Sequence, residues 1–490
     1  MKAVPLLAKF HTLQAGKQPK RPVRKSLASI TQMLFSHYRD AYIRDHQLTT
    51  PLSYLQEQTI RSNWLGIIHK ELYRDVNLGA RRKQMRTHPY LMSFLEIIKT
   101  SPLTVNYNFD DTLEKMLLFS RTKEEATKTR GYETTYKPNA QFQNNAGVIY
   151  HPNGFLPSPF EEGSSPEVIF SDDAFQDQLI SAATGKYVHL SGHLFRNTCL
   201  LIGVSLEDAT LQNLLRQNAV SNPGHIHYIV HFTAKSAALD LKTRQAIFEA
   251  NFLSYNLYTL FLDNAGIRNL ALLIDQGDSE FRLAFPKKRR KFVYYVVGSV
   301  GAGKSTVSAN FRNLRTYDEW IDPKKSDLAF PEDELPPAKI PGLDKWIAEQ
   351  FRKKNYAVVE ANEGIHLIDR SPLDPLTFGD PKRRPAKAAR LIRVITGTKP
   401  IAPGHVIYLD SAVADLKVRN SYKHKYWSDE KLERLLRAID EIYGPVTKSV
   451  VCTRGRNAHE VAREISKVIF VEEYVEYNIQ SELEKHARTV

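Results

Sequence analysis

Cysteine is scarce in this chain, whose 490 residues include only Cys199 and Cys452, far apart in the sequence. Two distant thiols exclude a disulfide framework and the paired Cys and His spacings of structural zinc sites. Long apolar runs are missing as well, since no stretch approaches the roughly 18 residues that a membrane-spanning helix needs. We therefore expect a cytoplasmic protein in a reducing compartment, with no membrane partner.

Internal repeats and long low-complexity tracts are also absent, which excludes a repeat array. What remains is the composition of a globular protein, with 42% hydrophobic and 25% charged residues. A chain of this length is expected to contain two or three domains with large cores.

Acidic residues are lacking from positions 1–39, which contain eight Lys and Arg, and a second basic run occupies Lys287–Arg290. These two segments supply most of the net charge of +14. Basic runs of this kind are typical of solvated linkers, so we do not expect nucleic acid as a partner, although a phosphate-binding patch is the alternative. The acid-poor start superficially resembles a transit peptide, but residues 28–38 have the pattern of an amphipathic core helix, so we expect no cleavage.

The alternation of short strands and helices predicts an α/β protein with parallel sheets wrapped by helices. The resemblances described below imply two doubly wound parallel-sheet domains, the first of the Rossmann type and the second of the P-loop NTPase type. We expect the first domain at residues 1–285, a basic linker at 286–291 and the second domain at 292–480. Helices are predicted at residues 28–48, 54–75, 90–100 and 306–314, and strands at 292–297, 356–360, 365–369, 405–409 and 447–453. Residues 321–341 contain five prolines and are predicted to be an irregular insertion.

The segment Gly298–Ser305 fits G-x-x-x-x-G-K-[ST], the pattern of a loop that cradles nucleotide phosphates. Its small residues let successive backbone N–H groups converge on an anion. Lys304 would supply a positive charge for the outer phosphates, and the Ser305 hydroxyl would bind Mg²⁺. The residues predicted to bind ATP or GTP are Gly298, Gly301, Gly303, Lys304, Ser305 and Thr306. The alternative is a Gly-rich turn that binds nothing.

Three more segments follow this loop in a set order. They are Asp318 to Trp320, the Asp369-Arg370-Ser371 sequence at a strand end, and the basic stretch Lys417–Lys425 after the strand at 405–409. This order resembles the P-loop kinases of the deoxynucleoside and thymidylate kinase superfamily over most of the second domain. The resemblance implies phosphoryl transfer to a nucleoside or nucleotide acceptor.

Phosphoryl transfer depends mainly on positioning and charge neutralisation, which gives these residues their expected roles. Glu319, or Asp318 beside it, would accept the proton of the acceptor hydroxyl. Arg370 would hold the acceptor through a bidentate contact, and Asp369 would orient Arg370 or the metal. We predict that Glu319, Asp369 and Arg370 meet in one pocket beside Lys304. Alternatively, Asp369 and Arg370 form a structural ion pair, and the two acids cap a turn.

Arg419 is the preferred cation of a lid over the phosphates, ahead of Lys423 and Lys425. The alternative is that the stretch Lys417–Lys425 is only a solvated helix face. Trp320 and Phe378 are candidates for stacking on a base, but large aromatic residues also commonly belong to the core.

The first half carries a second resemblance, again through three ordered segments. A strand runs into a turn at Leu103–Glu114, the segment Gly147–Pro157 contains a strand that ends at a glycine, and an apolar strand from Cys199 ends in a small-residue loop that reaches Asp208. Together they resemble the sirtuin-like NAD-binding fold of bacterial antiviral defence proteins.

The sirtuin-like resemblance implies NAD as a cofactor, with Asn108 at the nicotinamide ribose. Gly203 and Ser205 would contact the adenosine side, where strand ends of a doubly wound sheet form a crevice. Asp110 is a further cofactor-binding candidate. The alternative for Asn108 to Asp110 is an Asx turn that closes a strand.

Two departures from the family pattern bear on catalysis. Asn153 stands where the family has its general-base histidine, and an amide cannot take a proton near neutral pH. His151 lies two residues earlier, so on a strand it would face the same side and could substitute. Only Gly16, Gly66 and Gly79 precede Asn108, and none belongs to a phosphate-gripping cluster. We predict a crevice shared by Asn108, His151, Asn153 and Ser205, with little or no NAD hydrolysis.

Three hypotheses for the function follow. In the first, a P-loop kinase-like sensor is coupled to a sirtuin-like effector of the NAD-hydrolase type in an antiviral defence protein. In the second, the chain is a nucleoside or nucleotide kinase with an inert sirtuin-like scaffold. The third, a nucleic-acid-binding ATPase, rests on charge alone. Association into a homo-oligomer is left open by the sequence.

Overall fold

The chain, seen in a computed structural model, forms two compact units, Met1–Val188 and His189–Val490. The structure describes residues 27–74, 89–120, 132–137, 147–158, 164–166, 168–169, 171–206, 208–234, 239–276, 278–329, 332–397, 399–421 and 427–488. The basic residues before position 27, Lys423 and Lys425 lie outside these ranges. The domain limits 1–285 and 292–480 stay a prediction.

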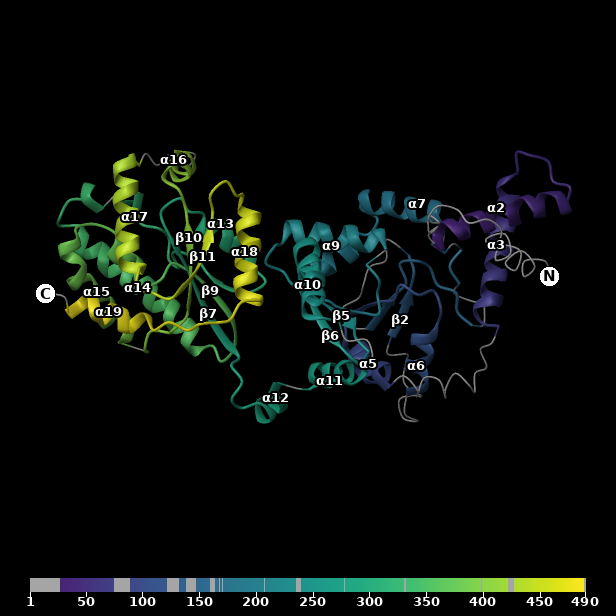
Figure 1. Cartoon of the computed structure of the whole chain (residues 1–490), viewed down its shortest axis with the longest axis horizontal. Helices are drawn as coiled ribbons and strands as arrows, with labels where there is room; N and C mark the ends of the chain where they lie inside the picture. The colour runs from purple at the N-terminus through teal and green to yellow at the C-terminus, as the bar shows by residue number, and fades with distance from the viewer. Residues whose placement is uncertain are drawn as a thin grey trace. The chain divides into compact units, whose positions relative to one another are not determined.

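The first unit combines helices with a parallel three-stranded sheet in the order β1-β3-β2. Its strands are β1 (Leu103–Val105), β2 (Tyr132–Thr135) and β3 (Gly147–Tyr150), and its helices include α2 (Leu27–Asp45), α3 (Tyr54–Leu72), α5 (Pro89–Thr100), α6 (Thr112–Ser120) and α7 (Asp172–Ala183) (Figure 1). Leu95 of α5, Met116 and Leu117 of α6 and Ile149 of β3 form a buried core. The three helices predicted before residue 101 are therefore confirmed within a few residues.

The second unit begins with a parallel sheet in the order β4-β5-β6. Its elements are α8 (Val188–Arg196), β4 (Leu200–Ile202), α9 (Ala209–Ser221), β5 (His227–Phe232), α10 (Leu241–Tyr255), β6 (Leu257–Leu262), α11 (Asn264–Asp275) and α12 (Asp278–Ala284). Asp208, Asp240 and Asp263 cap α9, α10 and α11, because each carboxylate accepts a hydrogen bond from a backbone N–H of the first turn. These caps explain why the three helices start where they do.

A five-stranded parallel sheet in the order β11-β10-β7-β9-β8 organises the rest of this unit. The strands are β7 (Lys291–Gly298), β8 (Arg315–Tyr317), β9 (Gly364–Asp369), β10 (His405–Asp410) and β11 (Lys448–Cys452). The helices are α13 (Lys304–Ser308), α14 (Ile340–Glu360), α15 (Arg384–Thr396), α16 (Val413–Ser421), α17 (Asp429–Tyr443), α18 (Ala458–Phe470) and α19 (Ile479–Arg488). The predicted α/β class with parallel sheets is confirmed.

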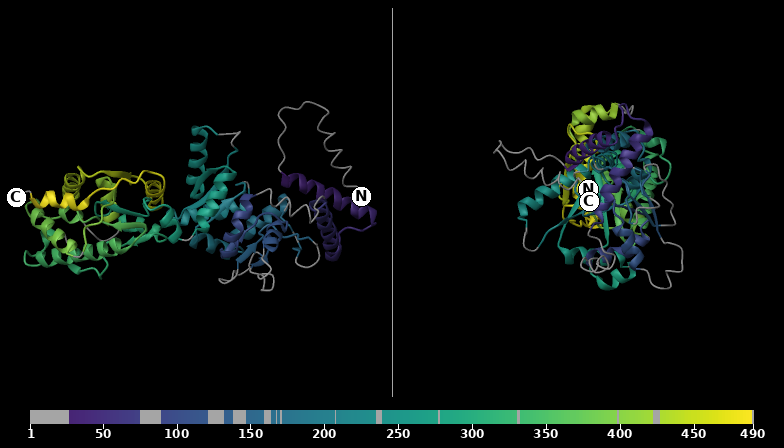
Figure 2. Two further views of the ribbon diagram at one scale, coloured as in Figure 1. Left: turned by 90° about the horizontal axis from the view of Figure 1, so that it is seen from below. Right: turned by 90° about the vertical axis from the view of Figure 1, so that its right-hand side faces the viewer.

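Alternating residues of β7 build a core on each face of this sheet. Tyr294 and Val296 pack with residues of α13 and α18, whereas Val293, Tyr295 and Val297 pack with residues of α14, α15 and α19. Helices coloured green to yellow accordingly flank the sheet on both sides in Figure 2. Since β7, β9 and β10 are parallel, their carboxyl ends lie at one edge, where open α/β sheets bind ligands.

The sequence prediction was wrong at residues 356–360, which belong to α14 rather than to a strand. A short apolar run cannot be told from the end of a helix by periodicity alone. The buried Phe351 and Val358 are seven residues apart and lie on one helix face. The helix predicted at 306–314 ends early, with a 3-10 turn at Ala309–Phe311, and β8 follows it unpredicted.

Residues 321–341 lack long regular elements over the positions that the structure describes, as predicted. They contain two 3-10 turns, Ser326–Ala329 and Glu332–Glu334, before α14 begins. Among the described residues, no helix combines the length and the apolar character needed to cross a membrane.

Candidate functional site

The loop between β7 and α13 depends on glycine. Gly301 and Gly303 have φ angles of 84° and 96°, a region that side chains disfavour. A Cβ added at Gly301 would lie 2.7 Å from the Asn420 amide nitrogen. The Lys304 ammonium donates hydrogen bonds to the carbonyl oxygens of Gly298 (2.8 Å) and Ser299 (2.9 Å). The Lys304 side chain therefore folds back over the loop that carries it.

The Lys304 side chain is buried, and its surroundings alter its acidity. Burial and, after it, the positive charge of Arg370 lower the pKa of the ammonium to about 8. The carboxylates of Asp369 and Asp374 oppose these two effects. A phosphate group in the loop would add negative charge and favour the protonated form.

Ser305 and Asp369 form a candidate site for a Mg²⁺ ion. The Ser305 hydroxyl donates to Asp369 Oδ2 at 2.6 Å, and Asp369 is 0% exposed. No described residue bonds Asp369 Oδ1, so a buried carboxylate oxygen lacks a partner. Mg²⁺ is commonly bound by one or two protein oxygens together with phosphates and water, so the pair fits this ion. No group of three or more His, Cys, Asp or Glu that could hold a metal occurs among the described residues.

Arg370 follows β9 in a left-handed conformation, with a φ of 71°. Its Nε donates to Glu319 Oε1 at 2.9 Å, and its Nη1 donates to Asp374 Oδ2 at 3.1 Å. The Tyr443 hydroxyl donates to the second oxygen of Asp374. Although burial disfavours the charged form, the carboxylates of Glu319 and Asp374 keep the pKa of Arg370 raised. Strained backbone of this kind is found at functional sites.

Glu319 faces the site as an ionised carboxylate, the form that can accept a proton. Burial alone would raise the pKa of this carboxyl, but the charges of Arg370 and Lys304 outweigh burial and lower it. Arg370 contacts only Oε1 of Glu319, which leaves Oε2 without a bond from any described residue. Asp318 instead is exposed and pairs with Arg312 at 2.7 Å. Of the two acids considered, only Glu319 lines the pocket.

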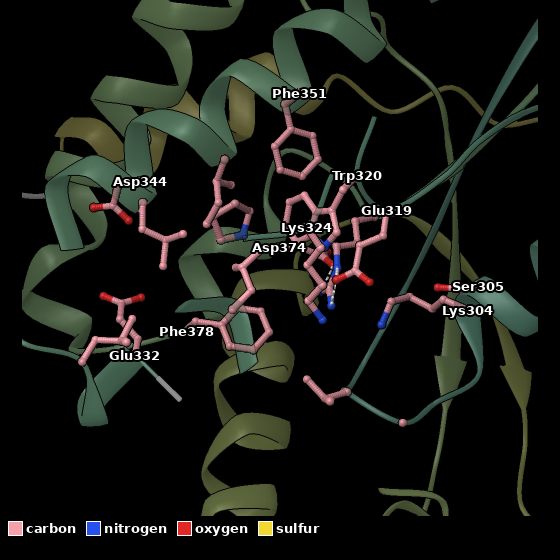
Figure 3. A pocket seen from close by; sticks show the side chains of 18 of the residues that line it. Lys304, Ser305, Glu319, Trp320, Lys324, Glu332, Asp344, Phe351, Asp374 and Phe378 are labelled. Atoms are coloured by element: carbon pink, nitrogen blue, oxygen red, sulfur yellow. Dashed lines mark hydrogen bonds and ion pairs between the residues drawn. The ribbon is translucent and has the colours of Figure 1, made fainter. Parts of the chain in front are cut away.

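One pocket contains most of the predicted kinase residues. Its lining includes Lys304, Ser305, Glu319, Trp320, Glu332, Asp344, Phe351, Arg370, Asp374, Phe378 and Lys387. Figure 3 shows Lys304 and Ser305 at one end, Glu332 and Asp344 at the other, and Trp320, Phe351 and Phe378 between them. Glu319 and Arg370 therefore line one pocket together with Lys304, whereas Asp369 does not line it and bonds Ser305 instead. The catalytic roles of all three stay predictions.

The far end of this pocket combines acids with bases. Glu332 is paired with Arg383 and Lys387, and Asp344 Oδ2 lies 2.9 Å from Arg383. A ligand reaching this end would meet both hydrogen-bond acceptors and a donor, since Glu332, Asp344 and Lys387 all line it.

Arg419, the predicted lid cation, does not line the pocket. Its guanidinium donates to the carbonyl oxygens of Thr453 (2.9 Å) and Ala302 (3.5 Å). Arg419 therefore borders the phosphate loop but is committed to main-chain oxygens in this conformation. Lys417 is exposed and pairs with Asp429 at 3.1 Å.

Sequence reasoning missed Lys354, Asp374 and Tyr443, whose side chains bond the predicted residues. Lys354 is 1% exposed, and its ammonium donates to the carbonyl oxygen of Asp369 at 2.8 Å. Only Asp374 had a weak signal, because it closely follows Arg370 in the same polar segment. Lys354 lies in a helix, where a lysine normally indicates a solvated face.

His151, the candidate substitute base of the first unit, has both ring nitrogens engaged. Its Nδ1 lies 2.7 Å from the Asn108 carbonyl oxygen, and its Nε2 lies 2.8 Å from Glu114 Oε1. The side chain is 0% exposed. This geometry favours a structural role for His151, since a general base must reach the proton that it removes.

Asn153 is buried and also bonded. Its amide nitrogen donates to the Tyr107 carbonyl oxygen at 3.3 Å, and its amide oxygen accepts from Gln178 at 3.1 Å. Asp110 accepts a hydrogen bond from the backbone N–H of Thr112 at 2.9 Å, which is the local bond of an Asx-type turn.

Gly203 and Ser205 are exposed in the loop after β4, and Gly203 has a φ of 65°. They belong to the unit His189–Val490, whereas Asn108, His151 and Asn153 belong to the other unit. A crevice shared by these residues would join the two units, so it stays a prediction.

Comparisons with known proteins give two kinds of similarity. Residues 102–256 match the family model of the SIR2-like domain, and no curated protein matches the chain. Similar solved structures include a deoxyadenosine kinase from M. mycoides with dATP (14% identity, 37% of this chain, 100% of that chain, TM-score 0.28). Others are a shikimate kinase from Acinetobacter baumannii with shikimate (16%, 38%, 96%, 0.25) and the NadR protein with NR (14%, 68%, 80%, 0.24). The chain thus contains a SIR2-like region, and P-loop kinases are among its structural neighbours.

Proposed function

We propose that the C-terminal part of this chain is an ATP- or GTP-dependent phosphotransferase. The observation that carries the proposal is a single pocket that starts at the phosphate loop and has Glu319 and Arg370 on its wall. Mg²⁺, held by Ser305 and Asp369, would neutralise developing phosphate charge when nucleotide is bound. Glu319 would accept the proton of the attacking hydroxyl, and Arg370 would orient the acceptor.

The acceptor that suits this pocket is a nucleoside or nucleotide. Trp320, Phe351 and Phe378 offer apolar aromatic surface beside the reacting end, which favours a planar ring. Asp344 and Lys387 offer an acceptor and a donor farther away, which suits the mixed polar edge of a base. A panel of nucleosides and nucleoside monophosphates, assayed for acceptor-dependent consumption of Mg²⁺-ATP and Mg²⁺-GTP, tests this class.

Lys304→Ala is expected to weaken binding of Mg²⁺-ATP or Mg²⁺-GTP at least about tenfold, or roughly 1.4 kcal/mol. The variant removes the charge that the loop holds for the outer phosphates. Calorimetry of the full chain measures the change. Lys399→Ala is the control, because Lys399 is exposed and pairs with Glu360 at 3.0 Å. Equal affinity in the wild type and Lys304→Ala would end the nucleotide-site assignment.

Nucleotide affinity is also expected to fall as pH rises above about 8. The pKa of Lys304 is lowered to about 8 in the free chain, and bound phosphates would raise it, so binding above this pH takes up a proton. The loss should approach about tenfold per pH unit, whereas affinity below pH 8 should change little through this group. Calorimetry between about pH 6.5 and 9.5 measures the slope. Lys304→Ala should remove the slope, and a slope that survives in this variant would assign it to another group.

The SIR2-like match favours a second, broader role. We propose that the chain is a cytoplasmic bacterial defence protein in which the nucleotide site acts as a sensor for a SIR2-like effector of the NAD type. The family match at residues 102–256 supports the effector class. NAD cleavage that persists in Lys304→Ala would favour a separate effector. Acceptor-dependent ATP consumption with unchanged NAD would favour a kinase with an inert scaffold, and tight, salt-sensitive DNA binding would favour a nucleic-acid-binding ATPase.

A further inference from the structure

One face of α14 lies beside the main chain of the segment Glu319–Asp322. Trp346, Gln350 and Lys354 are spaced four residues apart, which places them on the same side of a helix. The rings of Trp346 and Trp320 lie 5.1 Å apart between centroids. Trp346, Gln350 and Lys354 thus form a stripe along α14, which begins at the aromatic contact with the pocket residue Trp320.

The two polar members of this stripe bond to main-chain groups. Gln350 Oε1 accepts hydrogen bonds from the N–H groups of Ile321 (3.0 Å) and Asp322 (2.9 Å). The Lys354 ammonium donates to the carbonyl oxygens of Asp369 (2.8 Å) and Glu319 (3.3 Å). Lys354 thus joins the residue before Arg370 to Glu319 itself.

Both side chains are almost completely buried, with exposed fractions of 0% for Gln350 and 1% for Lys354. Burial lowers the pKa of Lys354 to about 8. A buried ammonium is costly unless its hydrogen bonds are satisfied, and apolar residues could fill the same space at lower cost. Packing alone therefore does not explain why a buried ammonium occupies this position.

The sheet alone does not fix Glu319. It follows β8, a three-residue edge strand that pairs only with β9. Pairing ends at Tyr317, so the main chain beyond it depends on other bonds. Within the described part of the chain, the main-chain groups of Glu319, Ile321 and Asp322 receive such bonds from α14.

We propose that Gln350 and Lys354 form a clamp, the α14 clamp, that positions the proton acceptor Glu319 relative to Asp369 and Arg370. The two residues act through main-chain atoms and do not touch the substrate. This inference rests on the proposed phosphotransferase function. Displacements of about 1 Å in such a site can cost about 100-fold in rate, so loosening the clamp should affect turnover strongly.

The experiment compares Lys354→Met with Lys353→Met in the full chain. Lys353 is the adjacent residue of α14, is 40% exposed and pairs with the Asp322 carboxylate at 2.6 Å. The probes are Mg²⁺-ATP and the nucleoside panel. Lys354→Met should lower kcat by about 100-fold and change the KM for Mg²⁺-ATP by less than about threefold. Lys353→Met should leave both constants near the wild-type values.

Hydrogen exchange provides a readout that does not require turnover. In Lys354→Met, the amides of Ile321 and Asp322 should exchange faster, while those of residues 298–306 should keep their wild-type rates. A general loss of stability would accelerate both segments. If the wild-type chain shows no turnover, the proposed phosphotransferase function is wrong. The hydrogen-exchange rates would still show whether Lys354 holds the segment that contains Ile321 and Asp322.

The clamp is overturned by any of three results. Lys354→Met could retain wild-type kcat, Lys353→Met could lose as much activity as Lys354→Met, or exchange at Ile321 and Asp322 could stay unchanged in Lys354→Met. Gln350→Leu is a second test of the same idea and should reproduce the exchange change, because it removes the acceptor of both N–H groups.

Discussion

Glu319→Gln is expected to lower phosphoryl transfer by about 10²–10⁴-fold while Mg²⁺-nucleotide binding is retained. The amide keeps the size of the side chain but cannot take the proton of the acceptor hydroxyl. In the wild type, Arg370 and Lys304 lower the pKa of Glu319, so the carboxylate is ionised at neutral pH. Steady-state transfer to the active nucleoside and calorimetry with Mg²⁺-ATP measure the two quantities.

Asp318→Asn is the matched control for this variant. Asp318 precedes Glu319 but is exposed and pairs with Arg312, so its loss should leave transfer within about threefold, as is usual for an exposed ion pair. A strong loss of transfer in Asp318→Asn, together with full transfer in Glu319→Gln, would reverse the assignment of the two acids. Full activity in both variants would remove the proton-acceptor step from this segment.

The loop between β7 and α13 could be located from the sequence because its pattern is local. Residues 298–305 combine glycines with Lys304 and Ser305 in one continuous segment, between an apolar strand and a helix. The strands predicted around it at 365–369, 405–409 and 447–453 match β9, β10 and β11 within a few residues. A buried parallel strand is a short apolar run, so the pattern located these three strands, although a similar run at 356–360 belongs to a helix.

The supporting bonds of the site could not be predicted in the same way. Tyr443 reaches Asp374 from α17, 69 residues away, and Lys354 reaches Asp369 from α14. A buried polar residue on a helix has the same sequence signature as a solvated one. Misassigning residues 356–360 as a strand also hid the long helix whose face carries Gln350 and Lys354.

In the first half, ordered motifs identified a SIR2-like region that the family model also matches at residues 102–256. The same motifs could not predict which residues surround His151. Alternation along a strand suggested that His151 and Asn153 face one side, but β3 ends at Tyr150 and both residues lie in the turn that follows. Glu114 of α6, which bonds His151, lies 37 residues away.

This chain is expected to cleave NAD slower than a sirtuin-type enzyme measured beside it, by about 10²–10⁴-fold, because it lacks general-base assistance. Asn153 occupies the place of the base, and its amide is held by Tyr107 and Gln178. His151 is buried and bonded through both nitrogens. Release of nicotinamide from NAD by the full chain, followed over time, measures the rate.

Asn153→His is the informative variant, and it should restore little activity on its own. The new imidazole would take a buried position whose neighbours are arranged for an amide, so neither its orientation nor its access to a ribose is provided. Asn108→Ala serves as the control for any residual rate, because Asn108 is exposed and is the residue expected at the nicotinamide ribose. Robust NAD cleavage by the wild-type chain that Asn108→Ala abolishes would contradict the prediction. His151 would then have to leave Glu114 to act as the base, and a gain of cleavage in Glu114→Gln, which weakens this contact, would identify that movement.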